Sequence, residues 1–96
     1  EMRTLRNLGC ERLDGESGSV TSDEASEMVF VNRSFETTLQ VSWVDYDGGL
    51  VEYGSLEPRG LVHQATFVGH PWVVTDGEEC VGYYMPETAR TRVVFE

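Results

Sequence analysis

Four side chains between Tyr53 and Trp72 are of the types needed to line one small binding pocket. Tyr53 and Trp72 offer aromatic faces, while Thr66 and His70 offer a hydroxyl and an imidazole. Small-ligand sites are usually built in this way, from apolar walls and a few polar groups that orient the ligand. The stretch has one central histidine but no nucleophile paired with a base. It therefore predicts a binding site and not an enzyme.

Each of these residues also has an ordinary structural explanation. Aromatic side chains in β proteins usually pack against other side chains, and threonine is common in strands. A histidine between Gly69 and Pro71 suits a turn in which backbone groups satisfy it. Residue types alone therefore leave two functions open, a ligand-binding module and a structural domain that binds nothing.

Three other motifs point only weakly to chemistry. Asp45-Tyr46-Asp47-Gly48 begins like a calcium loop, but the later ligands are missing, so a hairpin turn is favoured. Cys80 has no local signature of a thiol protease around it. Asn32-Arg33-Ser34 is formally a glycosylation sequon, which matters only in a secreted protein. We expect no catalytic residue, no metal and no other cofactor.

Short strands are the elements that would position these side chains. From Met28 onward, β-rich runs alternate with turn residues at the spacing of an all-β sandwich. In the run from Thr38 to Tyr46, alternation places Leu39, Val41 and Trp43 on a buried face, and it places Ser42 on a wet face. The predicted strands are Gly18–Ser22, Met28–Val31, Thr38–Tyr46, Leu50–Tyr53, Leu61–Val68, Trp72–Val74, Cys80–Met85 and Arg90–Phe95.

The length of 96 residues suits one domain with a single core. Residues 1–16 are mostly polar, so we expect a peripheral, partly mobile N-terminal segment in which Leu5, Leu8 and Cys10 mark a short docked stretch. Residues 17–96 form the predicted sandwich domain. No apolar run approaches the roughly 20 residues of a membrane span. The sequence leaves the localisation open.

The net charge is −10, and all seven basic residues are arginines. Such a surface repels nucleic acid and anionic membranes, so neither is an expected partner. The two cysteines, Cys10 and Cys80, show no metal-ligand spacing. A disulfide between them, which requires an oxidising compartment, and two separate buried thiols are both open.

Four groups of residues resemble, in order and spacing, the β domain of the von Hippel-Lindau tumour suppressor family. They are Phe30-Val31-Asn32-Arg33-Ser34, Trp43-Val44-Asp45-Tyr46-Asp47-Gly48, Tyr53 with Leu56, and Thr66-Phe67-Val68-Gly69-His70-Pro71-Trp72. The resemblance runs from about Ser17 to Glu96, with one extra residue between Ser34 and Trp43. It implies a seven- to eight-stranded antiparallel β-sandwich.

The resemblance also implies a ligand, an extended peptide that carries 4-hydroxyproline. In the family the ring enters a pocket of two tryptophans and a tyrosine, here Trp43, Trp72 and Tyr53. A serine and a histidine bind the ring's hydroxyl, and the matching residues are Thr66 and His70. Phe67 stands where a tyrosine is usual. The segment Leu50–Ser55 is expected to pair with the ligand as an added strand.

Several departures from the family pattern bear on the partner. Positions that are basic around the family's pocket are Asp23, Val62, His63, Ala65 and Val68 here. We therefore expect a neutral or basic hydroxyprolyl peptide or protein. The family's helical domain, which docks on a ubiquitin-ligase scaffold, has no counterpart in these residues, so no such partner is expected through this chain alone. The alternative function is a structural sandwich that has lost its ligand.

Overall fold

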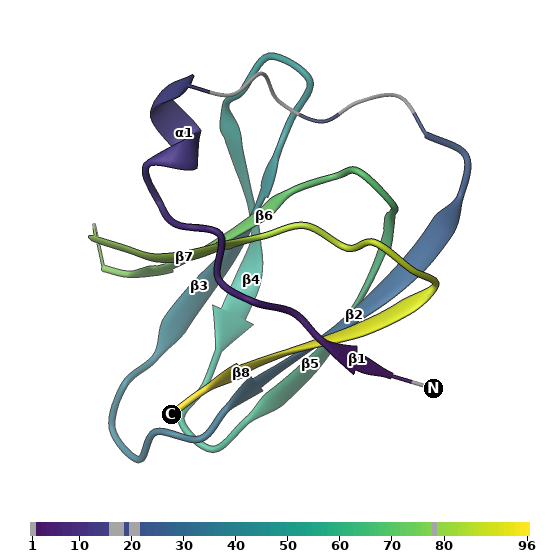
Figure 1. Ribbon diagram of the computed structural model, residues 1–96. Coiled ribbons are helices and arrows are strands. Elements are labelled where there is room, and N and C mark those ends of the chain that lie inside the picture. The colour runs from purple at the N-terminus through teal and green to yellow at the C-terminus, as the bar shows by residue number, and fades with distance from the viewer. Residues whose placement is uncertain (1, 16–18, 20–21, 78) are drawn as a thin grey trace.

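Two four-stranded sheets pack face to face in the computed structural model, which describes residues 2–15, 19, 22–77 and 79–96 (Figure 1). Sheet A contains, in spatial order, β1 (Arg3–Thr4), β8 (Arg90–Phe95), β2 (Ala25–Asn32) and β5 (Leu61–Phe67). Sheet B contains β4 (Leu50–Leu56), β3 (Leu39–Val44), β6 (Trp72–Asp76) and β7 (Glu79–Tyr84). A short helix, α1 (Arg12–Gly15), precedes β2.

The predicted all-β sandwich is confirmed, and the strands predicted from Met28 onward correspond to β2 through β8. The predicted strand Gly18–Ser22 lies mostly outside the described residues. Most pairs are antiparallel, but β8 runs parallel to both β1 and β2. This pairing follows from the path of the chain. After β7 the chain crosses from sheet B to sheet A, where β8 lies between β1 and β2.

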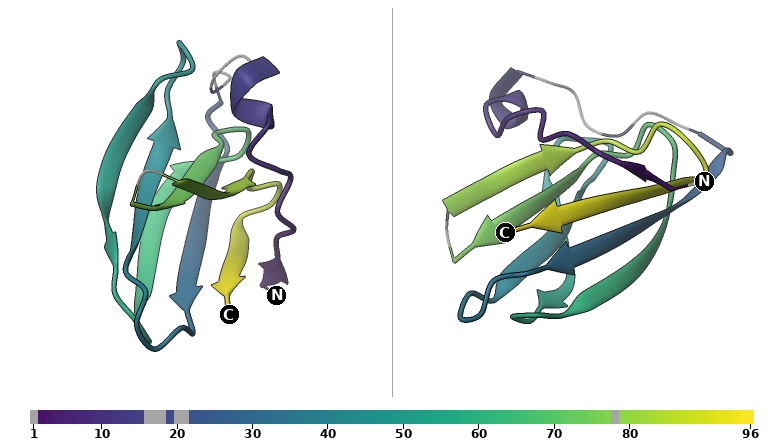
Figure 2. Two further views of the ribbon diagram at one scale, coloured as in Figure 1. Left: turned by 90° about the vertical axis from the view of Figure 1, so that its left-hand side faces the viewer. Right: turned by 60° about the horizontal axis from the view of Figure 1, so that its bottom comes forward.

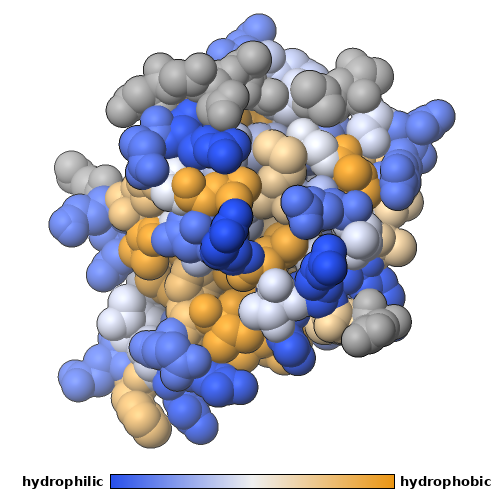
Figure 3. Space-filling view, viewed as in Figure 1, coloured by the Kyte–Doolittle hydropathy of each residue, from blue (hydrophilic) through white to orange (hydrophobic). Residues whose placement is uncertain are grey.

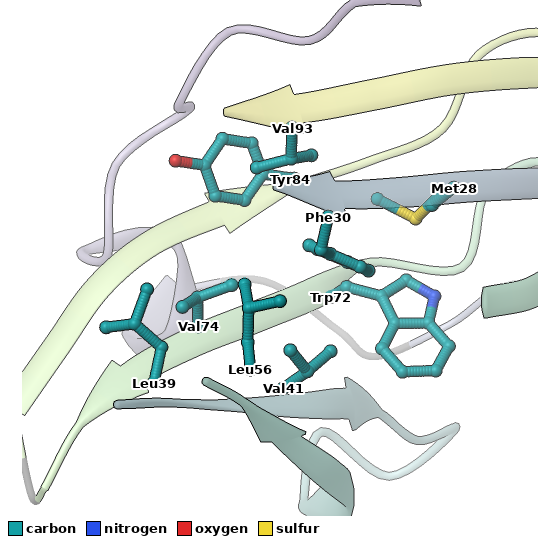
Figure 4. Close-up of a cluster of buried hydrophobic side chains, with 9 residues drawn as sticks. All are labelled: Met28, Phe30, Leu39, Val41, Leu56, Trp72, Val74, Tyr84 and Val93. Carbon is teal, nitrogen blue, oxygen red and sulfur yellow. The ribbon is translucent and has the colours of Figure 1, made fainter. Parts of the chain in front are cut away.

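Nine buried side chains from both sheets make the main core (Figure 4). Phe30 and Val93 enter it from sheet A, and Val41, Leu56 and Trp72 enter it from sheet B. Each fully buried side chain of this size contributes about 1.5–3 kcal/mol relative to an exposed one. The core therefore fixes how the two sheets face each other at the pocket described below.

The outer face of sheet B carries a second apolar cluster, which includes Val44, Val73 and Tyr83. Leu8 and Leu13 of the N-terminal segment pack against this cluster. The expectation of a wet face around Ser42 is therefore wrong. Ser42 is buried, because its neighbour Val73 lies in the covered cluster.

The N-terminal segment runs beside β8 and continues to α1, as Figure 2 shows in both views. It pairs with β8 through β1 and is joined to β7 by a disulfide between Cys10 and Cys80. The disulfide decides between the two alternatives for the cysteines, and a crosslink of this kind typically adds about 2–4 kcal/mol of stability. On the side of the molecule drawn in Figure 3, some apolar surface remains visible between hydrophilic side chains. None of the described helices is long and apolar enough to cross a membrane.

Candidate functional site

A pocket of about 210 Å³ opens between the two sheets, beside β4 and β5. All six predicted site residues line it: Trp43, Tyr53, Thr66, Phe67, His70 and Trp72. Tyr46 and Ala65 complete the lining. The structure therefore brings together residues that are up to 29 positions apart in the sequence, from Trp43 to Trp72.

Cross-strand pairing places the aromatic walls. Trp43 of β3 lies directly opposite Trp72 of β6, so both side chains stand on the same face of sheet B. The ring of Tyr53, on β4, meets Trp72 edge-on at a centroid distance of 5.0 Å. Tyr53 is still 53% exposed, so one side of its ring faces the entrance. The three rings form apolar walls around an open space.

Thr66 supplies a hydroxyl from the opposite sheet. Its Oγ1 accepts a 2.9 Å hydrogen bond from Nε1 of Trp72. A threonine hydroxyl that accepts one bond still has its own proton to donate. The indole therefore fixes the threonine oxygen as an acceptor and leaves a donor for a ligand.

His70 lies in the turn between β5 and β6. Its backbone N–H donates to the carbonyl of Phe67 at 3.2 Å, and the preceding Gly69 has a φ of 88°, which suits glycine. The ring is buried, with 5% exposed, and stacks on Trp43 at 5.7 Å. Its Nε2 is buried without a hydrogen-bond partner among the described residues. The turn therefore provides a hydrogen-bond partner for the backbone N–H of this histidine but not for its Nε2.

An unpaired polar atom of this kind costs about 1–3 kcal/mol in a folded protein. A second one lies nearby, since Nε1 of Trp43 is also buried with no partner in the described structure. Such atoms are uncommon in folded proteins and call for an explanation. Here both belong to stacked side chains that line one pocket.

Tyr46 is a pocket residue that the sequence analysis did not identify. Its ring meets Trp43 edge-on at 5.4 Å and His70 edge-on at 5.6 Å. It lies in the motif Asp45-Tyr46-Asp47-Gly48, which predicts a hairpin turn in preference to a calcium loop. Its position three residues after Trp43, at the end of a strand that lines the pocket, was the available signal.

The calcium-loop motif is a hairpin turn. Oδ1 of Asp45 accepts hydrogen bonds from the backbone N–H groups of Asp47 at 2.9 Å and Gly49 at 2.8 Å. Gly48 adopts a φ of 89°, as this turn requires. Among the described residues, no group of three or more His, Cys, Asp or Glu side chains is placed to hold a metal ion.

The sequon and the cysteine have structural roles. The Asn32 side chain is 1% exposed, and its Nδ2 donates to the carbonyls of Thr37 at 2.8 Å and Leu56 at 3.1 Å. Its Oδ1 accepts from the backbone N–H and the hydroxyl of Ser34. Cys80 is bonded to Cys10 and so has no free thiol for nucleophilic attack.

The surroundings of the pocket are poor in positive charge. No arginine lines it, and the chain has no lysine. His63 lies on the outer face of sheet A, where its Nδ1 is 3.5 Å from a carboxylate oxygen of Glu27. Of the other positions at which the family is basic, Asp23 and Ala65 are exposed, and Val62 and Val68 are partly buried. Nothing in this arrangement favours an acidic ligand.

In a comparison with protein families, the model of the VHL beta domain matches residues 18–85. This range includes every residue that lines the pocket. Comparison with curated proteins finds no match.

Proposed function

The chain belongs to the VHL beta-domain family of protein-interaction modules, and we propose that it binds an extended peptide through a 4-hydroxyproline residue. The ring of that residue enters between Trp43, Tyr53 and Trp72, where aromatic faces contact its methylene groups. Phe67, which is 40% exposed, and Tyr46 border the entrance. The pocket volume of about 210 Å³ suits a group the size of one small ring.

The main support for the proposal is that two polar side chains of the pocket can bind a hydroxyl group. The Thr66 hydroxyl has a proton to donate, and the His70 imidazole has an unpaired nitrogen. Thr66 already accepts from Trp72, so it donates its proton to the oxygen of the ligand's hydroxyl. The ligand's hydroxyl in turn donates to the imidazole of His70, whose Nε2 has no partner among the described residues. Thr66 and His70 then both have a hydrogen-bond partner that only a hydroxylated ring supplies.

This arrangement explains why proline would be a poor substitute. A prolyl ring fills the same apolar space but leaves the hydroxyl of Thr66 and Nε2 of His70 unpaired. Sites that leave buried polar groups unpaired discriminate against the unhydroxylated analogue far better than an apolar pocket does. Selectivity then comes from the two polar residues, and the rings contribute affinity for either ligand.

The free edges of the sandwich support an extended ligand. β4 and β5 are the outer strands of their sheets on the side of the pocket, and in the described structure each has a neighbouring strand on one side only. β4 contains the segment Leu50–Ser55, for which we predict strand pairing with the ligand, while β5 contributes Ala65, Thr66 and Phe67 to the pocket. A peptide along this side reaches the pocket while its backbone pairs with an edge.

Charge limits the kind of peptide. Asp47 and Glu52 are exposed on the turn and strand next to Tyr46 and Tyr53, and the net charge is −10. The flanking residues of the ligand are therefore neutral or basic.

Calorimetric titration with a matched pair of neutral peptides, one prolyl and one hydroxyprolyl, tests the proposal. We expect the hydroxyprolyl peptide to bind at least tenfold more tightly, which corresponds to about 1.4 kcal/mol. Equal affinities, or no heat with either peptide, would reject the proposal and favour the structural sandwich.

A further inference from the structure

The disulfide ties the N-terminal segment to the side of the sandwich that lies away from the pocket. Cys80 is on β7, which forms the edge of sheet B opposite β4. Cys10 lies two residues before α1, and its Cα is 6.0 Å from that of Cys80. The bridge uses both cysteines of the chain and leaves no free thiol.

The segment closes the β7 edge through the side chain of Asn7 and the backbone of Leu8. The Asn7 side chain donates to the Val81 carbonyl at 3.2 Å and accepts from the N–H of Tyr83 at 3.1 Å. The N–H of Leu8 adds one bond to the Tyr83 carbonyl at 2.9 Å. These bonds occupy the edge much as a neighbouring strand would.

The apolar support for this closure is limited. Leu8 and Leu13 are only partly buried, and α1 spans four residues, too few to be stable alone. The covalent bond between Cys10 and Cys80 adds to the pairing of β1 with β8 and to the bonds of Asn7 and Leu8 as a restraint on the segment. Without it, the stretch that covers the outer cluster of sheet B is held less firmly.

We infer that the chain folds and works in an oxidising compartment, and that its ligand is a hydroxyproline-bearing protein of the secretory lumen or extracellular space. Cytosolic reductants keep thiols reduced, whereas disulfides persist in oxidising compartments. A module that depends on this bond meets its ligand in such a compartment. The identity of the ligand rests on the proposed hydroxyproline pocket, while the compartment rests on the disulfide alone.

The unpaired edges of β4 and β5 beside the pocket also indicate the conformation and charge of the ligand. Sequences rich in proline and hydroxyproline adopt the polyproline II conformation, which is extended and has no internal hydrogen bonds. A single chain of this kind has free backbone carbonyls, and a free N–H at each residue that is not prolyl, for the edges of β4 and β5. Neutral flanking residues also avoid repulsion by Asp47 and Glu52.

Thiol trapping tests the compartment independently of the pocket. Cells that make the full chain are quenched with a membrane-permeant alkylating agent, and the mass of the protein is measured without reduction. We expect no alkyl group at Cys10 or Cys80. Two alkylated thiols would overturn the inference about the compartment and leave the proposed pocket untouched.

Thermal unfolding measures how far the stability of the fold depends on the disulfide. Reduction, or the double substitution Cys10→Ser and Cys80→Ser, should lower the thermal midpoint by at least about 8 °C. The double variant should still bind the same peptides at low temperature, because Cys80 lies on the edge strand opposite β4. A midpoint that moves by less than about 2 °C would show that the segment does not need the bridge, and would overturn this step.

Titration of the oxidised protein with three peptides tests the inferred class of ligand. The probes are a Pro-Hyp-Gly peptide too short to form a triple helix, its Pro-Pro-Gly counterpart, and a hydroxyprolyl peptide with acidic flanks. We expect the neutral hydroxyprolyl peptide to bind at least tenfold more tightly than either of the others. Preference for the acidic peptide would overturn the inferred partner class but keep the pocket, whereas no preference for hydroxyproline in any peptide would reject the proposed function itself.

Discussion

Trp72 and Thr66 join the two sheets inside the pocket, because the indole Nε1 on β6 donates a 2.9 Å hydrogen bond to the threonine Oγ1 on β5. Both side chains are almost completely buried, with 2% and 7% exposed. The bond holds the Trp72 ring, which forms a wall of the pocket, and the Thr66 hydroxyl, which is a polar group of the pocket, in fixed positions relative to each other. A substitution at either residue therefore has a structural and a functional effect.

The first prediction concerns Thr66→Val, which keeps the shape of the side chain but removes its hydroxyl. The indole N–H of Trp72 then loses its partner, so we expect the free energy of unfolding to fall by about 1–3 kcal/mol. The preference for hydroxyprolyl over prolyl peptide should fall to less than about threefold. Urea denaturation and calorimetric titration measure the two effects.

Thr66→Ser is the matched control, since it keeps the hydroxyl and loses one methyl group. It should retain most of the stability and of the selectivity. Full selectivity in Thr66→Val would contradict the assigned role of the hydroxyl.

The second prediction concerns His70→Phe, which keeps an aromatic ring against Trp43 and Phe67. Because Nε2 of His70 is buried and unpaired, its removal should leave the stability unchanged or raise it by about 1 kcal/mol. Binding of the hydroxyprolyl peptide should weaken at least tenfold. A gain in stability together with a loss of binding is the pattern expected of a residue kept for its ligand.

Comparison with His70→Ala distinguishes the contribution of the aromatic ring from that of its nitrogen atoms. It removes the stacked ring as well, so it should lose stability and binding together. If His70→Phe is also destabilised by more than about 1 kcal/mol, the imidazole has a structural role and the proposed acceptor is wrong.

Local patterns in the sequence predict the strands of this sandwich well. Asp45, Gly48 and Gly49 mark the hairpin between β3 and β4, and the structure confirms the turn. Alternation in β3 correctly predicts that Leu39 and Val41 face the core. These features depend on neighbours within a few residues, which is why the sequence alone reveals them.

Features that depend on distant contacts could not be predicted in the same way. The N-terminal segment closes β7 through Asn7, which contacts residues 74 and 76 positions away. The same segment buries the face around Ser42, which alternation alone assigns to water. Residue types alone suggested a pocket of Tyr53, Thr66, His70 and Trp72, whereas Trp43 and Phe67 were added only by resemblance to a family, since no periodicity links β3, β4, β5, β6 and a turn. Tyr46 was not predicted, because its motif was interpreted as a turn and its nearness to Trp43 in the sequence was not used.

The third prediction concerns the sequon at Asn32. Both hydrogen atoms of its side-chain amide are used in bonds to backbone carbonyls, so the folded protein cannot carry a glycan there. We expect the protein recovered from a secretory host to show no glycan mass. Asn32→Ala should lower the free energy of unfolding by about 2–3 kcal/mol, because the carbonyl of Leu56 loses a buried donor.

Ser34→Ala is the control for the sequon, because it removes the motif while the Asn32 amide keeps its two bonds to carbonyls. Its mass should differ from that of the wild type only by the substitution. Detection of a glycan on Asn32 in folded protein would contradict the buried position of this side chain.

The fourth prediction concerns stability at high pH. Burial raises the pKa of the Tyr84 phenol above its ordinary value of 10.0. The ring packs edge-on against Phe95 at 5.7 Å. Below pH 10.0, the phenol is protonated in the folded and unfolded states, so the pH does not change its contribution. As the pH rises from there through the higher folded pKa, the unfolded state loses its proton first and the folded state loses stability.

Urea denaturation at a series of pH values from about 8 to 11 measures this effect. The Tyr84→Phe variant should resemble the wild type at the lower end and show a shallower decline at the upper end, because its buried ring has no proton to release. Tyr53→Phe is the matched control for the loss of a tyrosine hydroxyl, since Tyr53 is half exposed. Equal declines in Tyr84→Phe and wild type would show that the Tyr84 phenol is not the group that couples folding to alkaline pH.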